Sequence, residues 1–551
     1  MDLKELHVSK TFTQWRPGQE ETVGKILDSF DLGKPFFFLD APCGTGKSLI
    51  AMATATIIND CEAVMDRMTD NEGFKPRVIY VTHTKQLQDQ LLKDFPQART
   101  VKGRANYPCA LKPEKFPEIT AEDCYSSSDC PKKDECPYLR AKYAAVNAPV
   151  SVLNYSYFLR EVNSSGMFRD AELIIFDEVD CLESALMNYI KFSISSKQLK
   201  KLNIAPPNLE EGDDFFQVWT KWAQKALDYC ILAQRMGMLE IEDRSEKGKK
   251  LKGYKELENE LNNFLRDVRQ DWIYSVKKDE AGNTTWTFKP IFLSNFLQYF
   301  YYGKRVLGMS GTILDPKTMA SNLGIPSYEY LQVKSPFPKE NRPIHYVPAA
   351  NLIRKEMQDE LPKLEAAITK IMELYPNDKI LVHTTSYPVR DYLQFRLDPF
   401  RVITHNPTDR EQQLKLFQLS KKPLVMLSPS FDRGVDLPGD MCRVIVVAKI
   451  PYIDMSDEQV KARMNASDGD RWYLMHTAQT LLQMTGRGMR SSDDYCRTFI
   501  LDKQFNKLFR RVYYLFPDWW KEAITNKINT ECLDKADKPP MVSFVSHEMQ
   551  K

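Results

Sequence analysis

A chain of 551 residues is too long for one hydrophobic core, so we expect roughly two to four domains. Its 43% hydrophobic and 27% charged residues are typical of a soluble globular protein and argue against a disordered one. The sequence has no apolar run long enough to span a bilayer and no apolar signal region at its N-terminus, so we expect a cytoplasmic protein without membrane partners, and a nuclear location stays open. Because the net charge is only +2, any nucleic-acid site must be a local one.

The first strong element is a strand followed by a glycine-rich loop. FFFL at 36–39 predicts a buried strand and the run after Ser48 predicts a helix, which disfavours a chance glycine turn. Gly44 and Gly46 would turn backbone N–H groups toward phosphate oxygens, Lys47 would reach the β- and γ-phosphates of ATP, and the Ser48 hydroxyl would bind Mg²⁺. The loop departs from the usual Walker A pattern only in its first position, an alanine. Its predicted nucleotide-binding residues are Ala41, Pro42, Cys43, Gly44, Thr45, Gly46, Lys47 and Ser48.

Further short apolar runs rich in β-formers follow, separated by helical patterns. This alternation predicts parallel α/β sheets. The runs fall into two series, so we predict two α/β units with a boundary near 333–343. The first series comprises 36–39, 77–82, 150–154, 173–176 and 305–310, and the second comprises 379–384, 401–404, 424–428, 443–450 and 497–502.

Four of the eleven cysteines cluster in a polar, proline-rich stretch: Cys109, Cys124, Cys130 and Cys136. An odd total in a chain of this kind disfavours a disulfide framework. Four thiolates can hold zinc or an iron–sulfur cluster. The spacing C-x14-C-x5-C-x5-C matches neither the close pairs of zinc ribbons nor the common ferredoxin patterns, so spacing alone leaves the metal open, and four unligated cysteines remain the weaker alternative.

LIIFDEVD at 173–180 ends a predicted strand with acidic residues. A phosphate loop needs a carboxylate for Mg²⁺ and a group that polarises the attacking water. Asp177 suits the first role and Glu178 the second. Acidic strand ends are common, but in a chain with a phosphate loop this pair indicates catalysis.

Residues 186–295 interrupt the strand–helix alternation and predict a mostly helical insertion. Within YKELENELNNFLRDVRQDW, apolar residues recur every three or four positions, which predicts one helix face. They are Tyr254, Leu257, Leu261, Leu265, Val268 and Trp272.

QMTGRGMR, in the second series, supplies polar and positive groups: Gln483, Arg487 and Arg490. Negative charge develops on the γ-phosphate during hydrolysis, and arginines stabilise it. Arg487 and Arg490 would share one helix face, and the alternative is a pair of solvated surface arginines. Since the phosphate loop belongs to the first series, ATP would be clamped between the two units, as in a motor.

The motifs resemble those of superfamily 2 DNA helicases of the XPD/DinG type over nearly the whole chain. The resemblance rests on their order: WRPGQ at 15–19, the phosphate loop, VTHTKQLQDQL at 81–91, VKGRANYPC at 101–109, DEVD at 177–180, MSGTIL at 309–314, HTTSY at 383–387, SFDRGVDLPG at 430–439 and QMTGRGMR at 483–490. Two features depart from the family pattern. Asp180 replaces its usual histidine, which puts the coupling to Ser310 and Gln483 in question, and the segment between DEVD and MSGTIL is short.

The resemblance implies an ATP-dependent DNA helicase that moves 5′→3′. Gln19 would read the adenine, Asp436 would join the nucleotide site, and the four clustered cysteines would hold a 4Fe–4S cluster. It also implies a domain layout: RecA-like domain 1 at 1–104, 141–185 and 296–332, an iron–sulfur domain at 105–140, a helical Arch-like domain at 186–295 and RecA-like domain 2 at 333–551.

Candidate contacts to single-stranded DNA lie near strand ends and beside the first cysteine: Thr82, Thr84, Lys102, Arg104, Thr385 and Ser386. Tyr107, Tyr155 and Tyr157 are candidates for base stacking, with core packing the stronger alternative for each. We expect a monomer that binds single strands and forked or tailed duplexes. One rival is a nucleic-acid-dependent ATPase that remodels protein–DNA complexes or R-loops. Another is a metal-stabilised nucleic-acid-binding protein whose ATP site acts as a switch.

Overall fold

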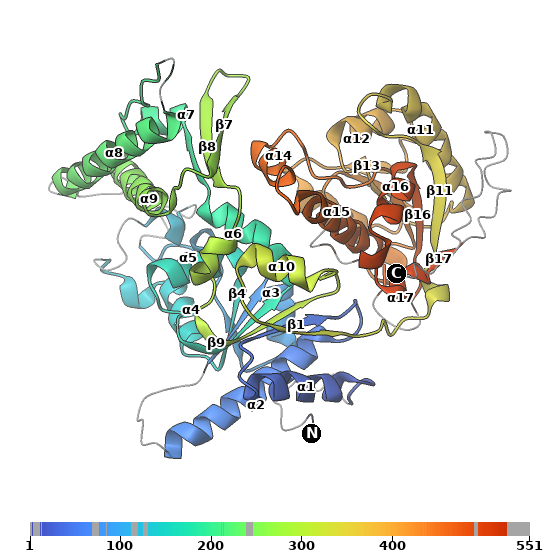
Figure 1. Ribbon diagram of the computed structural model, residues 1–551, viewed down its shortest axis with the longest axis horizontal. Helices are drawn as coiled ribbons and strands as arrows, with labels where there is room; N and C mark the ends of the chain where they lie inside the picture. Colours follow the sequence, from blue (N-terminus) through green and yellow to red (C-terminus); the bar gives the residue numbers. More distant parts are fainter. Residues whose placement is uncertain are drawn as a thin grey trace.

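The chain folds into two α/β lobes that lie side by side, with a smaller insertion above the first (Figure 1). The computed structural model describes Leu3, Phe12 and residues 14–68, 77–83, 85–111, 119–124, 130–210, 212, 214–238, 246–432, 435, 437–486, 488–489 and 494–525. Within these residues, no helix combines the length and hydropathy needed to cross a bilayer.

The first lobe is built on a seven-stranded parallel sheet with the order β10-β1-β9-β5-β2-β4-β3. Its strands are β1 (Phe36–Asp40), β2 (Val78–Thr82), β3 (Ala98–Thr100), β4 (Val150–Asn154), β5 (Ala171–Asp177), β9 (Gly303–Ser310) and β10 (Glu329–Gln332). Its helices are α1 (Gln19–Asp31), α2 (Lys47–Met68), α3 (Lys85–Asp94), α4 (Pro137–Val146), α5 (Tyr155–Ser164), α6 (Leu182–Ile190) and α10 (Pro316–Leu323).

The second lobe repeats this architecture with the sheet order β13-β14-β12-β15-β16-β11-β17. Its strands are β11 (Ile344–Ala350), β12 (Ile380–His383), β13 (Val402–Thr404), β14 (Val425–Ser428), β15 (Val444–Val447), β16 (Arg497–Asp502) and β17 (Ile524–Thr525). Its helices are α11 (Met357–Leu374), α12 (Tyr387–Gln394), α13 (Arg410–Leu419), α14 (Glu458–Met464), α15 (Gly469–Thr485), α16 (Gln504–Arg511) and α17 (Asp518–Lys521). All of its strand pairs are parallel, and β17 lies at the edge beside β11. The predicted fold class of two parallel α/β units is therefore confirmed.

The insertion contains helices and, unexpectedly, an antiparallel sheet. Its helices are α7 (Ser196–Lys201), α8 (Phe215–Met238) and α9 (Glu246–Asp267), and its strands β6 (Phe192–Ser195), β7 (Trp272–Lys278) and β8 (Thr284–Pro290) pair in the order β6-β8-β7. The predicted helix face was wrong at its end, because α9 stops at Asp267. Val268 follows the helix, and Trp272 begins β7, where its ring is buried.

Short 3₁₀ turns complete the fold: η1 (Arg104–Asn106), η2 (Ala121–Asp123), η3 (Lys133–Glu135), η4 (Val179–Cys181), η5 (Ser294–Tyr299), η6 (Lys339–Asn341), η7 (Gly439–Met441) and η8 (Tyr513–Leu515). The central strands of both lobes are buried on both sides, as expected for parallel sheets covered by helices. Each fully buried large side chain in them, such as Phe176, contributes about 1.5–3 kcal/mol relative to exposure.

Local sequence signals set the element boundaries that position the functional site. At the start of α10, the Asp315 carboxylate accepts a hydrogen bond from Thr318 N at 3.1 Å, and Pro316 fills the first helical turn. The helix ends at Gly324, whose positive φ of 69° suits glycine. The chain then forms β10 and crosses once to the second lobe between Gln332 and Ile344.

Candidate functional site

The phosphate loop lies between β1 and α2, at the carboxyl end of the first sheet. Gly44 and Gly46 have positive φ values of 82° and 78°, which glycine adopts without strain. A Cβ atom on Gly44 would lie 2.0 Å from the Phe337 ring, so a larger residue would also clash there. The Lys47 ammonium donates to the Ala41 carbonyl at 2.9 Å. The loop thus has the backbone shape that phosphate binding requires.

The predicted adenine-reading residue, Gln19, contacts the backbone of the phosphate loop. Its side-chain amide donates to the Thr45 carbonyl at 2.8 Å and accepts from Arg16 N at 2.9 Å. The side chain is buried, and the Arg16 guanidinium donates to the Gly44 carbonyl. Gln19 therefore braces the loop, while its contact with adenine stays a prediction.

Asp177 and Glu178 stand at the end of β5, next to the phosphate loop. The Tyr80 hydroxyl donates to Asp177 Oδ2 at 3.0 Å, and Tyr155 donates to the Asp177 carbonyl at 3.0 Å. Burial and the neighbouring Glu178 charge raise the pKa of Asp177 to about 6, against the opposing effects of Lys47 and Tyr80. Glu178 adopts the left-handed conformation with φ 55°, an uncommon one that re-aims the chain at the strand end.

Asp180 forms a hydrogen-bonded bridge between motifs. Ser310 Oγ, at the end of β9, donates to Asp180 Oδ1 at 2.7 Å, and Gln483 Nε2 donates to Asp180 Oδ2 at 3.1 Å. A carboxylate accepts from both donors at once. Asp180 therefore makes both of the contacts that its replacement of a histidine had put in question.

Gln483 comes from the second lobe, on α15, and reaches across the interface. Its amide Nε2 lies within hydrogen-bond distance of Thr312 Oγ1 at 2.9 Å and of Glu178 Oε2 at 3.3 Å, in addition to Asp180. One cleft between the lobes is lined by Lys47, Glu178 and Gln483 together with Phe337, Arg342 and Trp519. The structure thus brings together residues that are more than four hundred positions apart in the sequence.

The structure adds cleft residues that sequence reasoning did not single out. The Phe337 ring is buried against the second-lobe core and contacts Gly44. The Arg342 guanidinium donates to the Phe337 carbonyl at 3.1 Å and lies 5.6 Å from the centre of the Trp519 ring. A lone phenylalanine in the polar, proline-rich segment SPFPKENRP was the available signal.

Four predicted site residues lie outside the described residues: Thr84, Asp436, Arg487 and Arg490. Gly486 and Met489, which flank Arg487, line the cleft.

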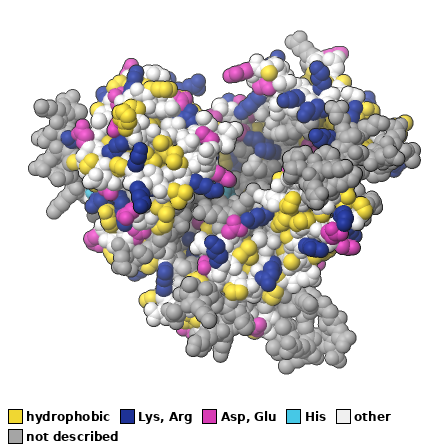
Figure 2. Space-filling view, turned by 180° about the vertical axis from the view of Figure 1, so that it is seen from behind, with side chains coloured by type: hydrophobic (Ala, Val, Ile, Leu, Met, Phe, Trp, Pro, Cys, Tyr) yellow, Lys and Arg dark blue, Asp and Glu magenta, His cyan; other side chains and the backbone are white. Residues whose placement is uncertain are grey.

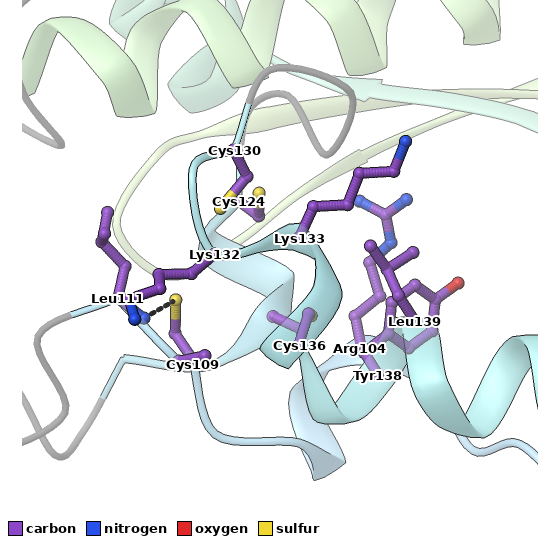
Figure 3. A pocket seen from close by; sticks show the side chains of 12 residues that line it. Arg104, Cys109, Leu111, Cys124, Cys130, Lys132, Lys133, Cys136, Tyr138 and Leu139 are labelled. Carbon is purple, nitrogen blue, oxygen red and sulfur yellow. Dashed lines mark hydrogen bonds between the residues drawn. The ribbon is translucent and has the colours of Figure 1, made fainter.

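The four clustered cysteines line one pocket (Figure 3). Cys109 is buried and accepts a hydrogen bond from Leu111 N at 3.4 Å, and the others are half-buried. The described cysteines form no disulfide. Within the described residues, no three His, Cys, Asp or Glu side chains already stand as a ligand set for one ion. Arg104, Lys132 and Lys133 add positive charge to the lining, which suits anionic thiolates.

The predicted DNA contacts fall into two groups. Thr82 and Ser386 stand at or just after the ends of β2 and β12, and in the described part of the chain their buried hydroxyls have no hydrogen-bond partner. Thr385, the residue directly before Ser386, has a left-handed backbone conformation with φ 53°. Lys102 instead pairs with Asp89 at 2.6 Å, and the Arg104 guanidinium lies 5.1 Å from the centre of the Tyr138 ring.

The three stacking candidates pack against other side chains of the protein, two of them in its interior. Tyr155 and Tyr157 are buried, and Tyr157 shares a hydrogen bond of 3.0 Å with the Tyr138 hydroxyl. Tyr107 is half-buried, and its ring packs edge-on against Tyr138. Core packing, the stronger alternative from the sequence, describes them.

On the face in Figure 2, lysine and arginine side chains are mixed with acidic ones, in keeping with the net charge of +2.

Comparisons with known proteins agree with this geometry. The helicase C-terminal domain family matches residues 368–523, and the family described as type III restriction enzyme, res subunit, matches residues 12–201. The chain is 23% identical to the ATP-dependent DNA helicase YoaA of Escherichia coli, covering 90% of this chain and 92% of that protein. It is 21% identical to the ATP-dependent DNA helicase XPD of Sulfolobus acidocaldarius, covering 90% and 97%.

Solved structures show the same fold. An XPD helicase superposes with a TM-score of 0.62 at 17% identity, covering 95% of this chain and 99% of that one. Xpd4 of S. tokodaii superposes with a TM-score of 0.56, covering 93% and 99%. Both α/β lobes of this chain therefore have counterparts in a known two-lobed architecture.

Proposed function

We propose that this chain, which belongs to the XPD/DinG type of superfamily 2 helicases, couples ATP hydrolysis to 5′→3′ movement along single-stranded DNA. The chain is an ATP-hydrolysing helicase, and its relatives by sequence are DNA helicases. Direction and strand preference are the new parts of the proposal, and they come from the family resemblance of the motifs.

One observation carries the catalytic part of the proposal: Gln483 of the second lobe donates to Glu178 of the first. Because residues of both lobes complete the site, hydrolysis requires the lobes to be closed. ATP binding and hydrolysis can therefore be coupled to closing and opening of the lobes, and so to movement. Lys47 would hold the β- and γ-phosphates, and Glu178 would polarise the attacking water. Arg487 and Arg490 would stabilise the charge that develops on the γ-phosphate.

The residues beside the phosphate loop suit a magnesium ion. The pKa of Tyr80, raised well above its usual value by burial and the Asp177 charge, keeps its hydroxyl a donor to that carboxylate. Ser48 and Asp177 would hold the metal, which would neutralise phosphate charge when bound. The other predicted nucleotide contacts are Gln19, Ala41, Pro42, Cys43, Gly44, Thr45, Gly46 and Asp436.

The cysteine pocket suits a metal centre with four thiolate ligands, and we propose a 4Fe–4S cluster there. Support comes from the shared pocket, from the absence of disulfides among the described cysteines and from the basic lining. The choice of iron over zinc rests on the family resemblance. Bound to Cys109, Cys124, Cys130 and Cys136, the cluster would cross-link a segment with little core of its own.

We propose that the single strand crosses the ends of both sheets, past Thr82 and Thr84 on the first lobe and Thr385 and Ser386 on the second. The positions of Thr82 and Ser386 at or just after strand ends support this path, and their buried hydroxyls, which have no hydrogen-bond partner among the described residues, would have to become accessible to bind a phosphate. Lys102 and Arg104 would contribute only after leaving their present partners. We further propose that the protein acts as a monomer on forked or tailed duplexes, with the domain division that the motifs predict.

The test is unwinding of short duplexes that carry either a 5′ or a 3′ single-stranded tail, with ATP and magnesium. We expect unwinding of the 5′-tailed substrate only and no activity from Lys47→Ala, which should still bind DNA. Unwinding from the 3′ tail would overturn the direction. DNA-stimulated ATP hydrolysis without unwinding of either substrate would favour an ATPase that remodels protein–DNA complexes or R-loops.

A further inference from the structure

Helix α15 presents one polar face to the first lobe. Trp472, His476, Gln479 and Gln483 are spaced by four, three and four residues, which puts them on one side of a helix. Each directs a nitrogen across the interface, and Gln479 Nε2 donates to the Thr312 carbonyl at 3.0 Å. One part of the seam between the lobes is therefore a row of hydrogen bonds along α15, and α14 adds the bond from Arg463 to Asn322.

At the far end of this row, the acceptor is Glu183 on α6. Its carboxylate accepts from Trp472 Nε1 at 2.8 Å and lies 3.2 Å from His476 Nε2. Asn322 Nδ2 approaches the same carboxylate at 3.3 Å. Burial raises the pKa of Glu183, but His476 and Trp472 outweigh it and hold the pKa below its usual value. Glu183 is thus an ionised group held by partners from both lobes.

Glu183 follows the catalytic segment directly in the sequence. Glu178 and Asp180 hold Gln483, and Glu183 holds α15 seven residues earlier, roughly 10 Å along the helix axis. Gln479 on Thr312 and Arg471 on Asp315 also attach α15 to the first lobe. Glu183 accepts from two side chains of α15 at once, so the short stretch from Glu178 to Glu183 holds the helix both at Gln483 and at the turn that carries Trp472 and His476.

We propose that Glu183 is a positioning residue for ATP hydrolysis: through Trp472 and His476 it fixes α15 so that Gln483 reaches Glu178. This inference rests on the proposed role of Gln483 at the ATP site and is independent of DNA unwinding. Arg471, on the same helix, donates to the Asp315 carboxylate at 2.6 Å and supports the seam from its outer side.

The experiment compares Glu183→Ala, Glu183→Gln and Trp472→Phe by DNA-stimulated ATP hydrolysis and, separately, by equilibrium binding of a fluorescent ATP analogue. We expect kcat of Glu183→Ala to fall about tenfold, because three donors lose a charged acceptor. The Kd for the analogue should change much less than kcat, because the phosphate loop, which supplies most of the predicted nucleotide contacts, belongs to the first lobe. Glu183→Gln keeps one acceptor oxygen and should recover part of the loss, and Trp472→Phe should lose about threefold.

Asp470→Asn is the matched control, because Asp470 lies on α15 but pairs with Arg511 of its own lobe at 2.5 Å. It should leave both quantities unchanged. Wild-type kcat in Glu183→Ala would overturn the inference, and so would a loss of analogue binding that parallels the loss of kcat. If Glu183→Ala fails to fold by circular dichroism, wild-type kcat in both Glu183→Gln and Trp472→Phe would overturn it. A protein that hydrolyses ATP as expected but unwinds nothing would contradict the proposed function and leave this inference standing.

Discussion

The ATP cleft and the cysteine pocket are built by different means. In the first-lobe half of the cleft, sheet register makes the motif residues neighbours: Asp40 of β1 pairs with Ser310 of β9, and Asp177 of β5 pairs with Met309 of β9. The cysteines instead sit around short turns, η1 to η3, with one isolated bridge between Pro108 and Thr120. A site at strand ends is held by the hydrogen bonds of the whole sheet, whereas a site on turns is held by few contacts of its own.

We therefore expect the two sites to be stabilised by different interactions. The cleft is organised by the polypeptide, and its ligands complete it. The buried side chains of the cysteine segment, such as Ala121 and Tyr138, join the first-lobe core and form no separate cluster among the described residues, so the group that the thiolates bind should be part of the segment's folding energy. Changes in one site should therefore leave the other intact.

Glu178→Gln should have the largest effect on activity. Removing the group that polarises water should lower ATP hydrolysis by about 100-fold or more, while ATP still binds. Single-turnover hydrolysis and nucleotide binding measure the two separately, and metal content should match the wild type. Glu329→Gln on the exposed edge strand β10 is the control. Hydrolysis at the wild-type rate in Glu178→Gln would remove Glu178 from catalysis.

Cys130→Ser should disrupt the cysteine pocket. The wild-type protein, purified anaerobically, should be brown and contain iron, and the variant should lose both and unfold at a lower temperature. The nucleotide Kd should be unchanged. Cys61→Ser, an exposed cysteine of α2, should change none of these. A colourless wild-type protein with stoichiometric zinc would contradict the iron–sulfur assignment.

Asp180→Asn should have a smaller effect within the cleft. An amide offers one acceptor oxygen in place of two, so either Ser310 or Gln483 loses its bond to residue 180 and keeps its contacts with Glu178 and Thr312. We expect kcat for ATP to fall about tenfold. Asp170→Asn, in the exposed turn before β5, is the control, and its positive φ of 59° suits asparagine equally well. Equal rates in the two variants would show that the bridge is dispensable.

The pH dependence should be the mildest effect. The pKa of Asp177 is raised to about 6, so the carboxyl is protonated at pH 5 and ionised at pH 7. Magnesium needs the ionised form, so KM for MgATP should rise as the pH falls through about 6. In the free protein the same shift favours the protonated form, so its contribution to stability is present at low pH and lost as the pH rises through about 6. A KM that is constant from pH 5 to 8 would contradict this role of Asp177.

The sequence predicted the central strands, the edge strand β13 and the motifs, but it missed β3, β10, β11 and β17. All ten predicted runs contain or overlap strands, because buried parallel strands are continuous apolar runs. The edge strand β10 (EYLQ) is half-exposed and polar, and β11 contains Pro348, so neither stands out. In the insertion, alternating residues such as Trp286 and Phe288 carried a strand signal that the preceding helical pattern obscured.

The sequence named many of the cleft residues but not their arrangement. Lys47, Glu178 and Gln483 were identifiable because their chemistry demands particular side chains near a phosphate. The brace of Gln19 on Thr45 and the contact of Phe337 with Gly44 depend on how distant segments meet, which no local pattern specifies. Tyr155 and Tyr157 show the reverse case, since an aromatic side chain looks the same in a sequence whether it stacks on a base or fills a core.

The described part of the second lobe begins and ends near the same edge of its sheet, where Ile344 pairs with Ile524 and its amide donates to the Ala523 carbonyl at 2.8 Å. Each sheet is therefore complete on one side of the single crossing between Gln332 and Ile344. In genetic terms, each lobe's sheet is encoded by one continuous stretch of the gene. A gene split within this crossing should yield two fragments that fold separately and reassemble when co-expressed, and the second half could be exchanged for that of a relative without rewiring either sheet.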